Sequence, residues 1–480
     1  MSDVYILLMF FLAIAVLVTL IAKFKIHPVP TLFIVVVALG LALGMGTGTI
    51  DLVQEGFGNT LTSVGLLVIW GCVLGKMLEL SGAAMRITDS ALQLFKKRKI
   101  PWGIALASTI VGIPLVADTV VVMLIPIVSV IAARTGRSMM VLGPILYMGA
   151  YVMTSVIPPG PGPLASAALL DVDFGQAILF GLAVGIPGIV AAVLYLLTIR
   201  TKVAPLAEYV QHLDTSDAET AGTRGPGAAA APRSERRVDT APAGQTQAVK
   251  PGELGITPTA GLGLTESLIP ILAPIVLIML SSFVSPLLGD SLVANVLDFI
   301  GTPTVALFLA CLMALPLFRR QWHDKKVVNG IVEQGLRMAA MFLALTGIGG
   351  SLALIIRETG VAENIAAAIE AAHMPPIIIP FLVAAVVCTI TGSNILGVMT
   401  AAAMMEPLLP TLGLDPLAVY LACATGAQIM KHPNSSGWWI TTTMSNMTVG
   451  QGIRSTGVAS LISGVTGFAV LNVLMLTGVV

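Results

Sequence analysis

A single carboxylate lies deep inside a long apolar stretch in the first half of the sequence. Asp118, followed by Thr119, sits in IVGIPLVADTVVVMLIPIV, which contains no other charged residue. A charged side chain at the centre of a membrane costs on the order of 2.5–3.5 kcal/mol even on the lenient insertion scale, so intramembrane carboxylates usually serve a proton, an ion or a substrate. We predict that Asp118 and Thr119 bind substrate and that Asp118 carries a coupling proton. The alternative is that Asp118 supports a helix end or pairs with a buried lysine.

A second polar point, built from small side chains, lies in the other half of the chain. Ser393 and Asn394 follow Gly392 in the apolar segment CTITGSNILGVMT. A hydroxyl, an amide and the N–H groups of a helix N-terminus together suit an anionic ligand. We predict that Ser393 and Asn394 bind substrate, and helix capping by either residue is the alternative.

Two proline-containing segments interrupt otherwise apolar runs. The sequence PPGPGP at 158–163 cannot continue a helix, because proline removes N–H donors and clashes with the preceding turn. Within a membrane such backbone is tolerated only inside protein or along a wet cavity. Pro159, Gly160 and Gly162 are therefore predicted to line the substrate path.

The second interruption, KHPNSSG at 431–437, adds a cation and several polar groups. Lys431 is suited to hold a substrate carboxylate, with extension to the cytoplasmic face as the alternative. His432 could relay a proton near neutral pH. We predict that Lys431, His432, Asn434 and Ser435 bind substrate and that His432 takes part in proton coupling.

The composition places all of these residues in a membrane protein. Of the 480 residues, 56% are hydrophobic and only 10% are charged, too few charges for a soluble surface of this size. Several apolar runs are long enough to cross a hydrocarbon core of ~30 Å, and the first lacks the flanks of a cleaved signal peptide. We expect spans at 4–22, 30–46, 61–80, 139–170, 176–199, 266–288, 303–318, 336–357, 416–446 and 456–479.

Lysine and arginine predict how these spans are oriented. Cytoplasmic loops carry the excess of basic residues, and placing the basic loops inside puts both termini outside. This works only if 102–133 begins and ends in the cytoplasm and 376–410 begins and ends outside. Two arms of ~15 residues reach only ~22 Å each, so both segments are predicted to be re-entrant helical hairpins.

The two halves repeat the same order of features. A glycine turn (Gly82, Gly360), a polar tip (Asp118, Asn394) and a proline break recur at nearly equal spacing, a pattern typical of transporters with a central site. We predict an all-α polytopic membrane protein with two inverted-topology repeats, each containing a re-entrant hairpin and a proline-broken transmembrane helix. The repeats are 1–202 and 265–480. A flexible cytoplasmic linker rich in Ala, Gly and Pro, 203–264, joins them.

At these segments the chain resembles the gluconate permease (GntP) family of the ion-transporter superfamily. The resemblance covers nearly the whole chain outside the linker, with Gly160 in place of a histidine, Ser435-Ser436 in place of Asp-Pro, and Asp118 near the usual position of a glutamate. It implies transport of gluconate-like sugar acids, glycerate-type acids or D-serine, generally with protons, and a homodimer. The similar segments are LGKMLELSGAAMRI, ADTVVVMLIPIVSVIAA, PPGPGP, GSNILGVMTAAAMMEPLL and HPNSSGWW.

The sequence therefore predicts a secondary active transporter of the inner membrane. We expect it to import a small anionic or zwitterionic organic acid by proton symport with alternating access, although sodium is an alternative coupling ion. Membrane lipids are the expected surroundings, and we expect no enzyme activity, cofactor, metal or nucleic-acid partner, because the usual enzyme and metal signatures are missing. An ion antiporter without organic substrate is the nearest alternative, and a membrane-embedded enzyme is a more distant one.

Overall fold

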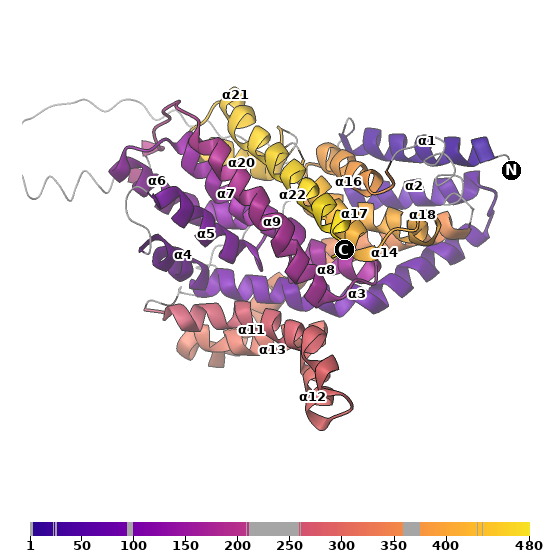
Figure 1. The fold of residues 1–480 in the computed structure, drawn as a ribbon, viewed down its shortest axis with the longest axis horizontal. Helices are drawn as coiled ribbons and strands as arrows, with labels where there is room; N and C mark the ends of the chain where they lie inside the picture. Colours follow the sequence, from indigo (N-terminus) through magenta and orange to yellow (C-terminus); the bar gives the residue numbers. More distant parts are fainter. Residues whose placement is uncertain are drawn as a thin grey trace, which may run out of the picture.

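The computed structural model describes residues 3–22, 24, 26–93, 99–207, 209–210, 259, 261–358, 375–429, 431–433 and 435–480. Within these ranges the chain is helical and contains no strand. Nine helices of the described residues are long and apolar enough to cross a membrane. The predicted all-α polytopic fold is confirmed (Figure 1).

The first half ends in a broken helix and one further long helix. Its helices are α1 Asp3–Ala22, α2 Pro28–Ala42, α3 Gly48–Ser81, α4 Ala83–Gln93, α5 Ile100–Gly112, α6 Ala117–Thr135, α7 Met139–Val156, α8 Pro161–Leu169 and α9 Phe174–Leu197. The predicted turn after α3 is confirmed, because Gly82 ends the helix with a left-handed φ of 85°. The short amphipathic helix α4 follows directly.

The second half contains a comparable series. Its elements are α11 Leu264–Phe283, η3 Ser285–Leu288, α12 Leu292–Gly301, α13 Pro303–Ala314, η4 Leu315–His323, α14 Lys325–Glu358, α16 Ile378–Thr391, α17 Asn394–Met405, η5 Glu406–Leu408, α18 Leu409–Leu412, α19 Pro416–Gly426, α20 Ser436–Met444, α21 Val449–Gly452, η6 Ile453–Gly457 and α22 Val458–Leu476. Here η6 is a π-helical turn. Helix α12, which projects from the body in Figure 1, was not predicted.

Helices α3 and α14 pack along each other and are longer than predicted. Each has 34 residues, so α3 begins well before 61 and α14 well before 336. Close packing explains the extension, since a Cβ on Gly56 would lie 2.7 Å from the Gly350 carbonyl oxygen. Ser351 also donates to the Val53 carbonyl at 2.7 Å. Tertiary contact therefore keeps segments helical that hydropathy alone left outside the spans.

Both predicted hairpin segments consist of two consecutive helices joined by a short turn. The first pairs α5 with α6, and the second pairs α16 with α17 through Gly392, whose φ is 72°. The first hairpin packs on the broken helix α7 and the second on α19. The arms are unequal, because α6 has 19 residues and α5 has 13. How deeply either hairpin enters a membrane remains a prediction.

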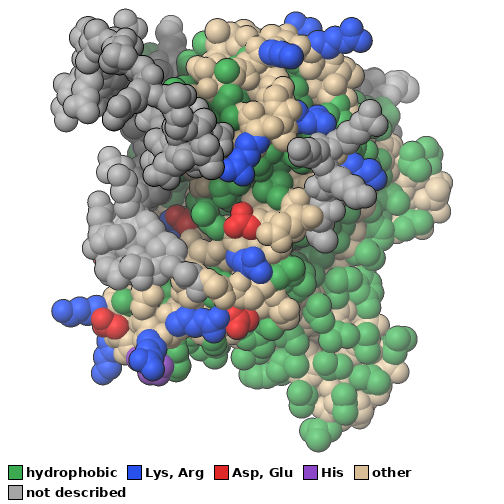
Figure 2. Space-filling view, turned by 90° about the vertical axis from the view of Figure 1, so that its left-hand side faces the viewer, with side chains coloured by type: hydrophobic (Ala, Val, Ile, Leu, Met, Phe, Trp, Pro, Cys, Tyr) green, Lys and Arg blue, Asp and Glu red, His purple; other side chains and the backbone are tan. Residues whose placement is uncertain are grey.

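Segments predicted to share one side of the membrane meet at the same end of the molecule. At the end assigned to the cytoplasm, Ser138 donates to the Thr201 carbonyl, and Thr259 bonds to Ser81 and Leu317. At the opposite end, Ser282 donates to Asp173 at 3.0 Å. Lysine and arginine side chains are spread over the face shown in Figure 2. Most of the predicted linker lies outside the described residues.

Candidate functional site

The tip of the first hairpin contacts the broken helix of the other half. Asp118 lies in the first turn of α6, and the Ser436 hydroxyl at the start of α20 donates to its Oδ2 at 2.6 Å. Gly437 permits this approach, because a Cβ there would lie 2.3 Å from Asp118 Oδ1. Thr119 follows in the same turn and is partly buried. The tip of the first hairpin is thus joined to the proline break at 431–437 in the second half.

The tip of the second hairpin makes the reciprocal contact. Asn394, the first residue of α17, is buried and donates through Nδ2 to Ser155 Oγ on α7 at 2.7 Å. Ser393 caps α17, accepting a hydrogen bond from the Leu396 N–H at 3.3 Å. Helix capping, the alternative to substrate binding, is therefore observed at Ser393. The side-chain amide of Asn394 instead bonds to the other half of the chain.

Lys431 lies inside the protein, with only 3% of its surface exposed. Its Nζ donates to the Gly392 carbonyl at 2.5 Å and lies 4.8 Å from the centre of the Tyr151 ring. The alternative in which Lys431 reaches the cytoplasmic face does not hold in this structure. Asp118 lies on the other side of the same tyrosines, because a Cβ on Gly437 would lie 2.3 Å from Asp118 Oδ1 and 2.9 Å from the Tyr147 hydroxyl, and Tyr147 stacks on Tyr151. An amine and a carboxyl group therefore share one region.

The first break brings α8 against the second hairpin. Pro159 and Gly160 are buried, and α8 begins at Pro161. A Cβ on Gly162 would lie 3.1 Å from the Ile395 side chain. The glycine therefore allows the start of α8 to pack on the start of α17, directly beside Asn394.

The remaining predicted residues lie around the second break. Ser435 is buried at the N-terminal end of α20, and its N–H donates to the His432 carbonyl at 2.9 Å. His432 is partly buried. Asn434 lies outside the described residues. Of the two tryptophans that follow, Trp438 is fully buried, and Trp439 is exposed and donates to the Pro433 carbonyl at 2.7 Å.

Sequence reasoning missed the face of α7 that supports the site. Tyr147 and Tyr151 stack with ring centres 5.0 Å apart, and Tyr151 donates to the Ala427 carbonyl at 2.8 Å. With Ser155, they form a row at intervals of four residues, which places them on one helix face. Polar side chains spaced by four residues in an otherwise apolar helix are the sequence signal that could have identified this face.

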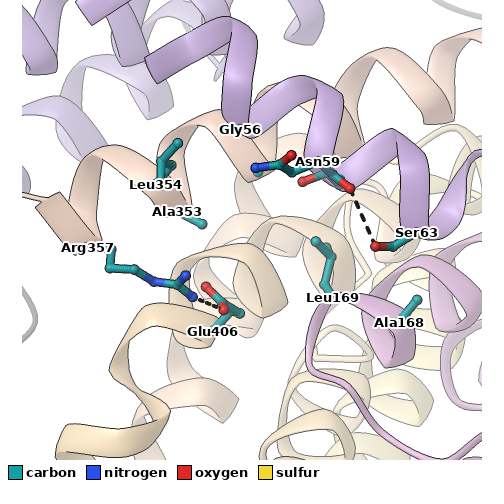
Figure 3. A pocket seen from close by; sticks show the side chains of 11 residues that line it. Gly56, Asn59, Ser63, Ala168, Leu169, Ala353, Leu354, Arg357 and Glu406 are labelled. Carbon is teal, nitrogen blue, oxygen red and sulfur yellow. Dashed lines mark hydrogen bonds and ion pairs between the residues drawn. The ribbon is translucent and has the colours of Figure 1, made fainter. Parts of the chain in front are cut away.

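A pocket separate from the hairpin tips lies between α3, α8, α14 and the segment that follows α17. Asn59 and Ser63 line it from α3, and Arg357 and Glu406 form an ion pair on another side of it (Figure 3). Other lining residues include Ala168 and Leu169 at the end of α8. We call the region of Asp118, Asn394 and Lys431 the central site. Helices α8 and α17, which pack on each other, connect the pocket to it.

The arrangement suits reversible binding of a small polar ligand. It combines a carboxylate, an ammonium group, an amide and several hydroxyls at the ends of broken helices. In the described part of the chain, no three His, Cys, Asp or Glu side chains gather as a metal site. Apolar spans surrounding polar residues at interrupted helices define a multi-pass membrane transport protein.

Comparison with known proteins identifies the family. The model of the GntP family permeases matches residues 5–228 and 240–477, so the chain belongs to this family. It is 30% identical to the gluconate permease of Pseudomonas aeruginosa over 482 residues, covering 99% of this chain and 98% of the relative. It is 25% identical to the Escherichia coli Gnt-II system L-idonate transporter, covering 88% and 89%. These matches confirm the resemblance seen in the sequence.

A solved structure supports the same fold. MtrF of Neisseria gonorrhoeae, described as a member of a class of antimetabolite efflux pumps, aligns with a TM-score of 0.57 over 95% of this chain and 96% of its own. At 14% sequence identity, this similarity concerns the fold.

Proposed function

We propose that this permease is a secondary active transporter that imports a six-carbon sugar acid of the gluconate or idonate type, or a related small hydroxy acid, by proton symport. The names of the relatives support the substrate class. The observation that carries the proposal is the pair of reciprocal contacts, Asp118 with Ser436 and Asn394 with Ser155. Each hairpin tip is bonded to the broken helix of the other half.

These contacts suit an alternating-access mechanism in an inverted repeat of 1–202 and 265–480. Two hairpins that dip from opposite faces and meet at broken helices can expose one central site to each side in turn. In the proposed orientation, both termini and the Arg357 pocket lie outside, and the 203–264 linker is cytoplasmic. The grouping of predicted cytoplasmic segments at one end supports this arrangement.

The roles of the charged groups follow from their chemistry. Lys431 is the group proposed to receive the substrate carboxylate, exchanging its bond with the Gly392 carbonyl for a charge-assisted one. Asp118 is proposed to take up a proton when the site faces outside and to release it when the site faces inside. Hydroxyls of the substrate can bond with Ser393, Asn394 and Ser435, and His432 offers a second proton carrier.

Counterflow in proteoliposomes tests this function. Liposomes containing purified protein and unlabelled gluconate should accumulate labelled gluconate transiently, and unlabelled sugar acids should compete better than hydroxy acids or D-amino acids. An ion antiporter without organic substrate predicts no counterflow with any member of the panel. An imposed inward proton gradient should then drive net uptake, whereas a sodium gradient should not.

A further inference from the structure

The pocket lined by Asn59, Ser63, Arg357 and Glu406 is large enough for a small organic acid. Its volume is about 180 Å³. For comparison, an engineered protein cavity of about 150 Å³ binds benzene. Figure 3 shows Arg357 and Glu406 paired on one wall of the pocket, and Asn59 and Ser63 on the wall that α3 forms. The pocket therefore offers a cation for a carboxylate and polar groups for hydroxyls.

Arg357 is an exception to the charge distribution of the molecule. Along the antiparallel pair α3 and α14, the other described lysines and arginines lie toward the opposite end, where Gly335 packs on Val73, whereas Arg357 lies beyond Gly350, which packs on Gly56. The end that carries Arg357 contains acidic residues instead, such as Asp51, Asp171 and Asp173. Among the described residues at this end, Arg357 is the cation that an approaching anion meets, and it lines the pocket.

The ion pair is suited to exchange partners. The side chains of Arg357 and Glu406 are 55% and 25% exposed, and pairs this exposed contribute only about 0–1 kcal/mol. The planar guanidinium of arginine can instead bind a substrate carboxylate through two parallel hydrogen bonds. A ligand carboxylate can therefore replace Glu406 at little cost.

The pocket also communicates with the central site through α17. Glu406 follows the last residue of α17, and Asn394 is its first. Twelve residues of helix span about 18 Å. Glu406 and Asn394 thus lie at opposite ends of one helix, and the near end bonds to Ser155.

We propose that this pocket is an outer binding site for the carboxylate of a sugar acid, in which the substrate displaces Glu406 from Arg357 before it moves to the central site. This inference rests on the proposed function and orientation. It assigns to Glu406 the role of an exchangeable partner that occupies Arg357 until substrate arrives.

Uptake of labelled gluconate into right-side-out and inside-out membrane vesicles tests the proposal. Arg357→Gln should raise the external KM by about tenfold or more, because a charge-assisted contact is lost, and leave the KM measured from the cytoplasmic side unchanged. Arg357→Lys should be intermediate, since it keeps the charge and loses the paired geometry. Glu406→Gln should lower the external KM by up to about fivefold, because the competing carboxylate is removed.

Arg337→Gln is the matched control. Arg337 lies on the same helix and pairs with Glu333 at 2.7 Å on an exposed surface, so its KM should not change. If Arg357→Gln fails to insert, the opposite shift expected of Glu406→Gln still decides the matter. Unchanged external KM values, or equal changes from both sides, would overturn the outer site while wild-type uptake leaves the transport function standing. If wild-type vesicles take up no sugar acid, both proposals fall.

Discussion

Removing the Ser436 hydroxyl tests whether the Asp118 contact belongs to the working site. The hydroxyl donates to Asp118 Oδ2 at 2.6 Å. A hydrogen bond to a charged group contributes about 1.5–3 kcal/mol, and each 1.4 kcal/mol is a factor of about ten in an equilibrium. If the bond stabilises the state from which substrate exchanges, Ser436→Ala should lower the population of that state, and with it the rate of gluconate exchange, by about 10- to 150-fold.

The same substitution should have a smaller effect in an Asp118→Asn protein. There the bond joins two neutral groups and contributes only about 0.5–1.5 kcal/mol, which corresponds to about 2- to 13-fold. The assay is gluconate exchange in proteoliposomes for all four proteins of a double-mutant cycle, normalised to inserted protein. A change of less than twofold in the wild-type background, or the same factor in both backgrounds, would refute a charged Asp118–Ser436 contact in the transport cycle.

Three further predictions concern the central site and its orientation. Lys431→Met should raise the KM for gluconate by about tenfold or more through loss of a charge-assisted contact, measured by counterflow; an unchanged KM would contradict the role of Lys431. Ser155→Ala and Asn394→Ala should show a coupling energy of about 0.5–1.5 kcal/mol in thermal unfolding, and strict additivity would count against their bond. Cysteines introduced at Asp51 and Lys202 should label from outside and from the cytoplasm respectively, and labelling from one side would exclude the proposed topology.

The sequence predicted the residues that break local rules. Asp118 is conspicuous because a carboxylate is costly in an apolar segment, and the prolines at 158–163 are conspicuous because they cannot continue a helix. Such signals are local, so they identify candidate positions without a structure. Asn394 and Lys431 were identified in the same way, and the structure brings these three polar residues into one region around α7.

The partners of these residues were beyond the sequence. Ser436 and Asp118 are 318 positions apart, and Ser155 and Asn394 are 239 apart. Serine is common in helices, and only the packing of the two halves determines which serine meets a tip. The early start of α3 was missed for a related reason, because its polar first turns are held in place by α14.

The central claim is that Asp118 couples proton movement to transport, and its most direct test separates uphill uptake from exchange. Asp118→Asn keeps the size of the side chain and can still accept a hydrogen bond from Ser436, but it cannot take up a proton. In proteoliposomes with an imposed inward proton gradient, we predict that this variant loses accumulation of gluconate and keeps counterflow. Protein amount and thermal stability must match the wild type. Uphill uptake with normal pH dependence in Asp118→Asn would contradict the claim and direct the search for the coupling group to His432.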